Sequence, residues 1–258
     1  MKTPTNLFKQ SILQKKPQIG LWISLASAYS AEICACTGFD WLLIDGEHAP
    51  NTIPNILSQL QAIASIPGNQ ALARVPVGDT AIIKQYLDIG VQTILVPMVD
   101  TAGQAQAIVQ AARYPQNDGL GGVRGMAGAR ASRWGKFPNY AQEANEQVCI
   151  LVQVETQTGL DNLEEIACTP GVDGILIGPN DLSASLGHVG DANHPRVQTA
   201  IEDAIKRILK VGKAPGILTI NEEQAKHYLS LGVVFICVGV DTSLLMRNGT
   251  ALAEKFKN

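Results

Sequence analysis

The stretch Cys149-Ile-Leu-Val-Gln-Val-Glu155 is an apolar run that ends in a carboxylate. A second run, Asp173-Gly-Ile-Leu-Ile-Gly178, is followed directly by Pro179-Asn180-Asp181. Near-continuous apolar runs of this length are typical of strands that are covered on both faces, as in a parallel sheet. Each run therefore predicts a buried parallel strand with an acidic side chain at or just beyond its carboxyl end.

Eight runs of this kind, rich in Ile, Val and Leu, are distributed along the chain. They cover residues 18–24, 40–45, 70–76, 93–97, 149–155, 173–178, 215–219 and 233–239. The segments between them carry helical spacing, most clearly at 81–87 and 199–208. Eight strands that alternate with helices predict a parallel (β/α)8 TIM barrel. An open doubly wound sheet is the alternative, but no Gly-x-Gly-x-x-Gly loop follows the first run.

Length and composition fit one soluble barrel domain that spans residues 1–258, with 46% apolar residues. A net charge of −3, from 20 basic and 23 acidic residues, gives no electrostatic basis for binding nucleic acid. The polar first 17 residues resemble neither a signal peptide nor a membrane span. Five cysteines, an odd number, argue against a disulfide framework. We therefore expect a cytoplasmic protein without a membrane partner.

Glu155 and Asp181 are the strongest candidates for metal ligands. Active sites of parallel barrels lie at the carboxyl ends of the strands, and two carboxylates there suit a hard divalent cation. Asp181 alone is equally typical of a helix N-cap, so the pairing with Glu155 carries the prediction. Gln153 shares the strand face of Glu155, where it contacts a substrate oxygen or orients Glu155. Asn180 precedes Asp181 at a helix start whose N–H groups suit a substrate carboxylate.

Four further residues are candidates for proton transfer and charge stabilisation. In Asp45-Gly-Glu-His48, which follows the second run, His48 is the best general base and Asp45 its orienting partner. Arg74 ends the third run and requires an anionic partner, either a barrel carboxylate or a substrate carboxylate or enolate. Asp88 closes a helix, where its charge is unfavourable. It is a second candidate partner for His48, across a subunit boundary.

The connection between the fourth and fifth runs is glycine-rich from Gly119 to Gly135 and carries Arg124, Arg130 and Arg133. Long irregular loops in a compact domain are often functional. Two interpretations remain open for this loop. It closes over an anionic substrate on the catalytic face, or it is a solvated or inter-subunit loop.

Several motifs in order resemble the HpcH/HpaI (2,4-dihydroxyhept-2-ene-1,7-dioic acid) aldolase family. The similarity extends from about residue 18 to 250. The matching motifs are Phe39-Asp-Trp-Leu-Leu-Ile-Asp-Gly-Glu-His48, Arg113-Tyr-Pro, Arg124-Gly, Ala131-Ser-Arg-Trp134, Val152-Gln-Val-Glu155-Thr, Ile177-Gly-Pro-Asn-Asp-Leu-Ser-Ala-Ser-Leu-Gly187 and Val238-Gly-Val-Asp-Thr-Ser243. The chain also has neither a Gly-x-Ser-x-Gly elbow nor a lysine within an apolar strand, which favours metal-stabilised enolate chemistry over covalent imine chemistry.

The resemblance implies a barrel of the phosphoenolpyruvate/pyruvate type and a class II pyruvate aldolase. Enzymes of this kind use Mg, Mn or Co ions and split a 4-hydroxy-2-oxo acid into pyruvate and an aldehyde such as succinic semialdehyde. The resemblance also implies a homohexamer, a trimer of dimers with an exchanged C-terminal helix, and a role in the breakdown of aromatic compounds. Other lyases of this barrel (malyl/citramalyl-type lyases or oxaloacetate decarboxylases) and an inactive metal-binding barrel are the alternatives.

The resemblance also assigns roles to individual positions. It implies that Glu155 and Asp181 hold the metal, that Gln153, Asn180 and Asp181 contact the oxo-acid, that Arg74 stabilises the transition state, and that His48 is the acid/base supported by Asp45 and Asp88. One position departs from the family, because Asn180 stands where the family often has Ala. The larger amide makes the identity of the substrate the least fixed of these inferences.

Overall fold

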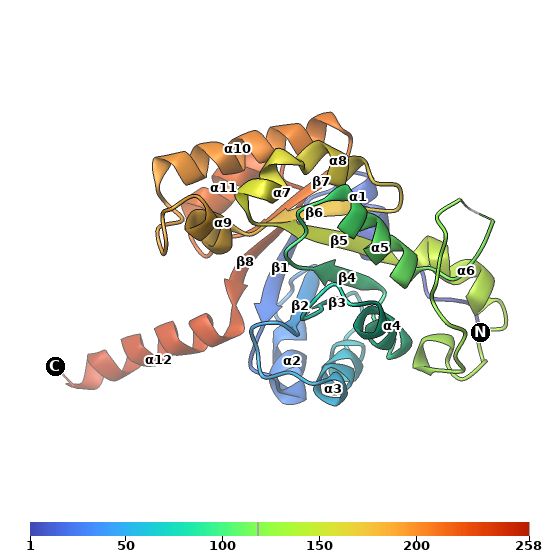
Figure 1. Ribbon diagram of the computed structural model, residues 1–258. Helices are drawn as coiled ribbons and strands as arrows, with labels where there is room; N and C mark the ends of the chain where they lie inside the picture. Colours follow the sequence, from blue (N-terminus) through green and yellow to red (C-terminus); the bar gives the residue numbers. More distant parts are fainter. Residues whose placement is uncertain (118, 258) are drawn as a thin grey trace.

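The computed structural model describes residues 1–117 and 119–257, which fold into a closed barrel of eight parallel strands (Figure 1). Neighbouring strands pair in chain order, and β8 closes the barrel against β1. The strands are β1 (Gln18–Ile23), β2 (Trp41–Asp45), β3 (Gln70–Arg74), β4 (Thr93–Val96), β5 (Cys149–Val154), β6 (Gly174–Ile177), β7 (Ala214–Leu218) and β8 (Phe235–Val240). The prediction of a (β/α)8 barrel is confirmed.

Helices surround the barrel and return the chain from the carboxyl end of one strand to the amino end of the next. They are α1 (Leu7–Leu13), α2 (Ala28–Ala35), α3 (Ile53–Ile63), α4 (Thr80–Asp88), α5 (Ala102–Ala112), α6 (Tyr140–Gln147), α7 (Gln157–Asp161), α8 (Leu163–Cys168), α9 (Pro179–Ser185), α10 (Pro195–Lys210), α11 (Glu222–Ser230) and α12 (Asp241–Lys257), with a 3-10 turn η1 (Arg130–Ser132) between α5 and α6. Among the described residues, none of these helices is long and apolar enough to cross a membrane.

The inside of the barrel is filled by alternate side chains of the strands. Leu43, Leu72, Leu151 and Leu176 belong to this inner cluster. Because strand side chains alternate with period two, the next inward positions are Asp45, Arg74, Gln153 and Gly178. The polar residues of the barrel mouth therefore continue the same inward-facing columns that form the apolar core.

The amino end of the barrel is closed by α1 and an aromatic layer. Phe8 makes edge-on contacts with Trp41 and Phe235, at ring-centroid distances of 5.9 Å in both cases. Asn6 caps α1 and donates a hydrogen bond of 2.9 Å to Thr93 of β4. This end is sealed by packing, so the open end at the strand carboxyl termini is the one that can admit a ligand.

The C-terminal helix α12 projects away from the barrel (Figure 1). Asp241 at its start is buried, and its carboxylate accepts hydrogen bonds from the backbone N–H groups of Ser24 and Leu25 at 2.9 and 3.1 Å. The rest of the helix exposes apolar side chains, such as Met246 at 70% and Phe256 at 83%. The exchange of this helix between subunits remains a prediction, and this uncovered face agrees with it.

Candidate active site

A cavity of about 240 Å³ lies at the carboxyl ends of the strands. Apart from Asp88, seven residues were predicted to serve catalysis, substrate binding or metal binding, and six of them line this cavity. The seventh, Glu155, accepts a hydrogen bond from Gln153, which is one of the lining residues. The lining residues are Trp22, Ser24, Asp45, His48, Arg74, Gln153, Leu176, Gly178, Pro179, Asn180, Asp181, Leu218 and Val240. The fold thus gathers residues from β1, β2, β3, β5, β6, β7 and β8, from the segments that follow β1 and β2, and from the first turn of α9.

Arg74 is held rigidly by carboxylates at the end of β2. Its Nε and Nη2 donate to the two oxygens of Asp45 at 2.9 and 2.8 Å, and its Nη1 lies 2.8 Å from Oε2 of Glu47. Trp22 donates from its indole Nε1 to Asp45 at 3.1 Å and stacks under the guanidinium at 4.8 Å. The bidentate pair fixes the plane of the guanidinium and directs it into the cavity.

Asp45 is occupied by Arg74, and this differs from the expected pairing with the imidazole of His48. Its contact with His48 is through the backbone N–H, at 3.3 Å. Burial by itself raises the pKa of Asp45, but the hydrogen bonds and charge of Arg74 outweigh it and keep the pKa below its ordinary value. Glycine at position 46 allows the chain to pass close to β3, because a Cβ there would lie 2.5 Å from the Arg74 carbonyl oxygen and 2.1 Å from the Tyr86 hydroxyl.

His48 lies at the rim of the cavity, with 65% of its side chain exposed. Its Nε2 is 3.8 Å from Oε2 of Glu47, so Glu47 rather than Asp45 is the nearest carboxylate to the imidazole. Burial raises the pKa of Glu47, against the lowering effect of the Arg74 and His48 charges. Sequence reasoning assigned no role to Glu47, although its position between Asp45 and His48 was a visible signal.

Glu155 is buried directly beyond β5, where its oxygens accept hydrogen bonds from two groups. The backbone N–H of Met98 donates to Oε1 at 2.9 Å, and the side-chain amide of Gln153 donates to Oε2. Met98 has a positive φ of 56°, a conformation that costs a non-glycine residue energy and that presents this N–H to the carboxylate. Position 178 must be glycine, because a Cβ would lie 2.5 Å from Glu155 Oε2.

The electrostatics of Glu155 favour a cation. Burial, together with the charges of Asp181 and Glu47, raises its pKa to about 7, against the hydrogen bonds from Gln153 and Met98. No salt bridge reaches Glu155 or Asp181 within the described residues, and Oε1 of Gln153 is buried without a hydrogen-bond partner. Two carboxylates with uncompensated charge are suitable oxygen ligands for a divalent ion.

Asp181 lies in the first turn of α9, and Gly178 rather than Asp181 occupies the N-cap position. The alternative of a simple capping role for Asp181 is therefore wrong. In the described part of the chain, no cluster of three or more His, Cys, Asp or Glu residues is arranged as a metal-binding set. Glu155 and Asp181 would consequently leave most coordination positions of an ion to the substrate and to water.

Asp88 is not part of the site of its own chain. It ends α4, near the amino ends of the strands, and its carboxylate accepts a hydrogen bond of 2.9 Å from Nη2 of Arg124. Arg124 is 2% exposed and lies 4.5 Å from the ring of Tyr114. Asp88 is therefore the anion that compensates a buried arginine. A catalytic role for it would require a neighbouring subunit and remains a prediction.

Replacing Asp88 with asparagine is expected to lower the free energy of unfolding by about 1–3 kcal/mol, because the buried Arg124 charge loses its partner. Urea titration of the single variants Asp88→Asn and Arg124→Met and of the double variant gives the coupling energy between the two residues. Additive effects would contradict the structural pairing. Loss of activity in folded Asp88→Asn would instead support the inter-subunit role.

The same contacts place the arginine-bearing loop at the amino end of the barrel. Arg124 binds Asp88, and Nη1 of Arg130 donates to the carbonyl of Ile89 at 2.7 Å. Because α5 returns the chain to this end before the loop begins, the loop does not cover the active site of its own chain. Of the two interpretations of the loop, closure over the substrate of the same chain is wrong.

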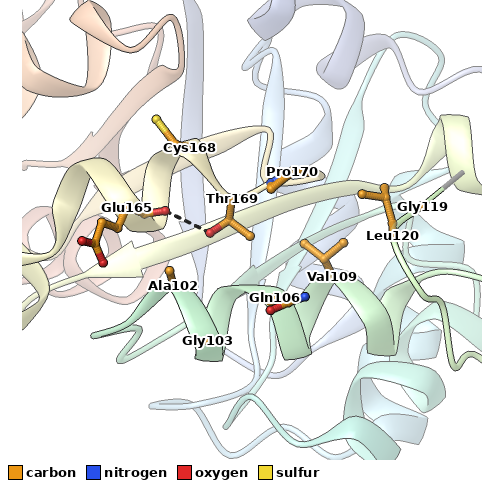
Figure 2. Close-up of a pocket in the computed structure, with 10 residues that line it drawn as sticks. All are labelled: Ala102, Gly103, Gln106, Val109, Gly119, Leu120, Glu165, Cys168, Thr169 and Pro170. Carbon is orange, nitrogen blue, oxygen red and sulfur yellow. Dashed lines mark hydrogen bonds between the residues drawn. The ribbon is translucent and has the colours of Figure 1, made fainter.

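Another cavity, of about 380 Å³, lies outside the barrel between α5 and α8 (Figure 2). Gln106 and Val109 approach it from α5, and Glu165 and Cys168 from α8, with Thr169 donating a hydrogen bond of 3.0 Å to the Glu165 carbonyl. None of the predicted site residues reaches it. The chemistry of the chain is therefore concentrated at the barrel mouth.

A closed (β/α)8 barrel with carboxylates, an arginine and a histidine at the carboxyl ends of its strands has the layout of a barrel enzyme. A sequence model of the HpcH/HpaI aldolase/citrate lyase family matches residues 18–248, and the chain belongs to that family. The family resemblance that the motifs indicated is confirmed.

Similar proteins agree with this membership. The hydroxypyruvate/pyruvate aldolase of Deinococcus radiodurans is 59% identical and covers 98% of this chain and 91% of its own length. The 4-hydroxy-2-oxo-heptane-1,7-dioate aldolase of Klebsiella pneumoniae subsp. pneumoniae is 56% identical, with 97% and 94% covered. A crystal structure of a family member from Burkholderia cenocepacia superposes with a TM-score of 0.95 at 40% identity, covering 98% of this chain and all 100% of that one. The chain is a carbon–carbon lyase of the aldolase type.

Proposed function

We propose that this enzyme is a divalent-metal-dependent aldolase that interconverts a 4-hydroxy-2-oxo acid with pyruvate and an aldehyde. The observation that carries the proposal is the buried Glu155, which accepts hydrogen bonds from Met98 and Gln153 and whose pKa is raised by burial and, to a smaller extent, by the charges of Asp181 and Glu47. A rigidly held arginine lines the adjoining cavity, 2.8–2.9 Å from the oxygens of Asp45. This combination suits a reaction in which negative charge develops on an oxygen next to a metal ion.

Glu155 and Asp181 would hold the metal ion, which is Mg, Mn or Co. When bound, such an ion supplies a positive charge that draws the carboxylate and 2-oxo group of the substrate into the cavity and stabilises enolate charge. Gln153, with its unpaired Oε1, and the Asn180 amide line the same space and would orient the oxo-acid. The raised pKa of Glu155 supports this assignment, because a cation would offset both the burial and the nearby carboxylate charges that disfavour its charged form.

Arg74 and His48 would divide the remaining chemistry. His48 takes the proton from the 4-hydroxyl, the C3–C4 bond breaks, and its electron pair forms the enolate of pyruvate while the aldehyde is released. The Arg74 guanidinium, fixed by Asp45 and Glu47, donates to the enolate oxygen and needs no reorganisation to do so. Protonation at C3 then gives pyruvate. Glu47, 3.8 Å from the imidazole, would stabilise its charged form.

Replacing His48 with alanine is expected to lower kcat for aldol cleavage about 100-fold, the usual effect of losing a general base. Decarboxylation of oxaloacetate passes through the same enolate but removes no hydroxyl proton, so it should be largely retained. Stability should change by less than about 0.5 kcal/mol, because the side chain is mostly exposed. Equal loss of both reactions, measured on one preparation, would contradict the assignment of His48 as the base.

The function itself is tested by measuring pyruvate release from a panel of 4-hydroxy-2-oxo acids with Mn or Mg ions and after EDTA treatment. Release that requires the ion, and that is restored by adding it back, supports the proposal. A folded protein that binds Mn ions and releases no pyruvate from any substrate would contradict it. Dicarboxylic, hydroxylated and simple alkyl members of the panel would identify the preferred aldehyde.

We also propose a homohexamer, a trimer of dimers, in the cytoplasm. The exposed apolar face of α12, which includes Leu245 at 64% and Phe256 at 83% exposed, supports exchange of this helix between subunits. All five cysteines are free thiols, which supports a reducing compartment. Light scattering of the full chain, and of a chain shortened before α12, would measure the assembly.

A further inference from the structure

A side cavity of about 390 Å³ adjoins the active-site cavity, and four residues (Pro179, Asn180, Leu218 and Val240) line both. It lies between the loop after α9, the connection from β7 to α11, and the first turn of α12. Its remaining lining residues are Gly190, Ala192, Asn193, Gln198, Thr219, Ile220, Asn221, Gln224, Tyr228 and Ser243. The two cavities are therefore direct neighbours that meet at Asn180, and the far end of a substrate held at the metal site would reach the second cavity there.

The polar lining of the side cavity is uncharged. Five side-chain amides and three hydroxyl groups face it, and the residues that line it include no Lys, Arg, His, Asp or Glu. The N-terminus of α11, which borders the cavity, is already capped by Asn221, whose Oδ1 accepts the Gln224 N–H at 3.0 Å. That helix also carries Glu222 and Glu223 in its first turn, which oppose an incoming anion.

Hydrogen bonds hold the side-chain amides of Gln224 and Asn193 in place. Gln224 donates from Nε2 to Asn193 at 2.7 Å and accepts from the Thr219 hydroxyl at 3.0 Å. In the part of the chain that the structure describes, the Asn193 side-chain nitrogen, the Asn180 amide and the Ser243 hydroxyl make no hydrogen bond, and all three residues line the cavity. Amides and hydroxyls with free donors and acceptors match hydroxyl groups, which both donate and accept.

We propose that the side cavity binds a neutral, hydroxyl-bearing carbon chain of the substrate and selects it over a chain that ends in a carboxylate. A carboxylate would gain no cation there and would lose part of its hydration. The inference rests on the proposed aldolase function and specifies its substrate class. This carbon chain of the substrate belongs either to the aldehyde or to the C3 substituent of the 2-oxo acid, and both present the same chemistry to the cavity.

The test compares kcat/KM in two series. One series keeps pyruvate and varies the aldehyde among glyceraldehyde, propanal and succinic semialdehyde. The other keeps one simple aldehyde and compares hydroxypyruvate with 2-oxobutyrate. Wild-type enzyme is expected to prefer the hydroxylated member in at least one series, which identifies the source of the chain. The absence of any preference for the hydroxylated member in both series would overturn the proposal.

Variants at Asn193 attribute the preference to the side cavity. Asn193→Leu, of similar size, should reduce the preference for the hydroxylated compound about threefold to tenfold, the range of one neutral hydrogen bond. Asn193→Lys should raise relative activity on succinic semialdehyde about fivefold, the upper range of an exposed ion pair. Asn139→Lys, at the opposite end of the barrel, controls for added charge. Ser243→Ala provides an independent variant if the loop around Asn193 does not tolerate change.

Exchange of the pyruvate methyl protons in D2O with Mn ions separates this inference from the proposed function. The aldol rates of each variant are divided by the exchange rate of the same variant, because exchange requires enolate formation but no aldehyde. Absence of exchange in the wild type would contradict the proposed aldolase function. Normal exchange together with preferences that stay within about twofold of wild type in every side-cavity variant would overturn the side-cavity proposal alone.

Discussion

Replacing Glu155 with glutamine is expected to lower pyruvate release about 1,000-fold or more, and to stabilise the metal-free protein at pH 8. The first effect follows from the loss of a metal ligand, since a metal ion contributes several kcal/mol to stabilising an enolate. The second follows because Glu155 is a buried charge beside Asp181 and Glu47. The neutral glutamine side chain at position 155 keeps the hydrogen bond from the Met98 N–H. It can also donate to Oε1 of Gln153 if the side-chain amide of Gln153 flips.

The pH dependence has a defined sign. The pKa of Glu155 is raised in the folded protein from 4.5 to about 7, so its contribution to stability is full below about pH 4.5 and is lost as pH rises through about 7. The metal-free wild type should therefore lose on the order of 2 kcal/mol between pH 5 and pH 8 from this group. Glu155→Gln should not show that loss, and Mn ions should stabilise the wild type but not the variant.

Thermal unfolding at pH 5, 6, 7 and 8, with EDTA and with Mn ions, measures both effects in one series. Glu146→Gln, on the exposed surface of α6, is the matched control, because it removes the same charge far from the barrel mouth. A variant that binds Mn ions with wild-type affinity, or that keeps wild-type pyruvate release, would exclude Glu155 as a metal ligand.

The apolar runs predict the barrel because eight buried parallel strands leave few other arrangements for alternating elements. They also predict which end carries the chemistry. Glu155 and Asp181 follow the strands β5 and β6, which are neighbours in the sheet, and the structure makes their charges interact. The sequence is sufficient to place these two residues at the barrel mouth, because the position of each depends only on where its own strand ends.

The partners of side chains were harder to predict, because they depend on contacts between strands. Asp45 lies directly opposite Arg74 in the register of β2 and β3, and this cross-strand pairing outcompetes the imidazole three residues along the chain. Trp22, which donates to Asp45 from β1, gives no signal in sequence because an indole in an apolar strand is ordinarily core. Asp88 and Arg124 are 36 residues apart, and only the return of α5 and its loop to the amino end joins them.

Replacing Arg74 separates its catalytic contribution from its contribution to stability. Arg74→Met leaves the buried Asp45 without a cation and removes the arginine beside the half-buried Glu47, which should cost about 3–5 kcal/mol of unfolding free energy and all measurable aldolase activity. The double variant Asp45→Asn/Arg74→Met removes the unpaired Asp45 charge as well. It should recover part of that stability and none of the activity, because no guanidinium then faces the enolate oxygen.

Arg74→Lys separates the contribution of the fixed guanidinium geometry from that of the positive charge alone. Lysine keeps the charge but cannot reproduce the bidentate contacts of Nε and Nη2 with Asp45, so its ammonium group has no fixed position above Trp22. We expect a folded protein whose kcat falls about 100-fold or more, comparable to removing one oxyanion donor, with a smaller change in KM. If kcat stayed near the wild-type value, Arg74 would act only through its charge, and the preorganised guanidinium would not be the group that stabilises the enolate.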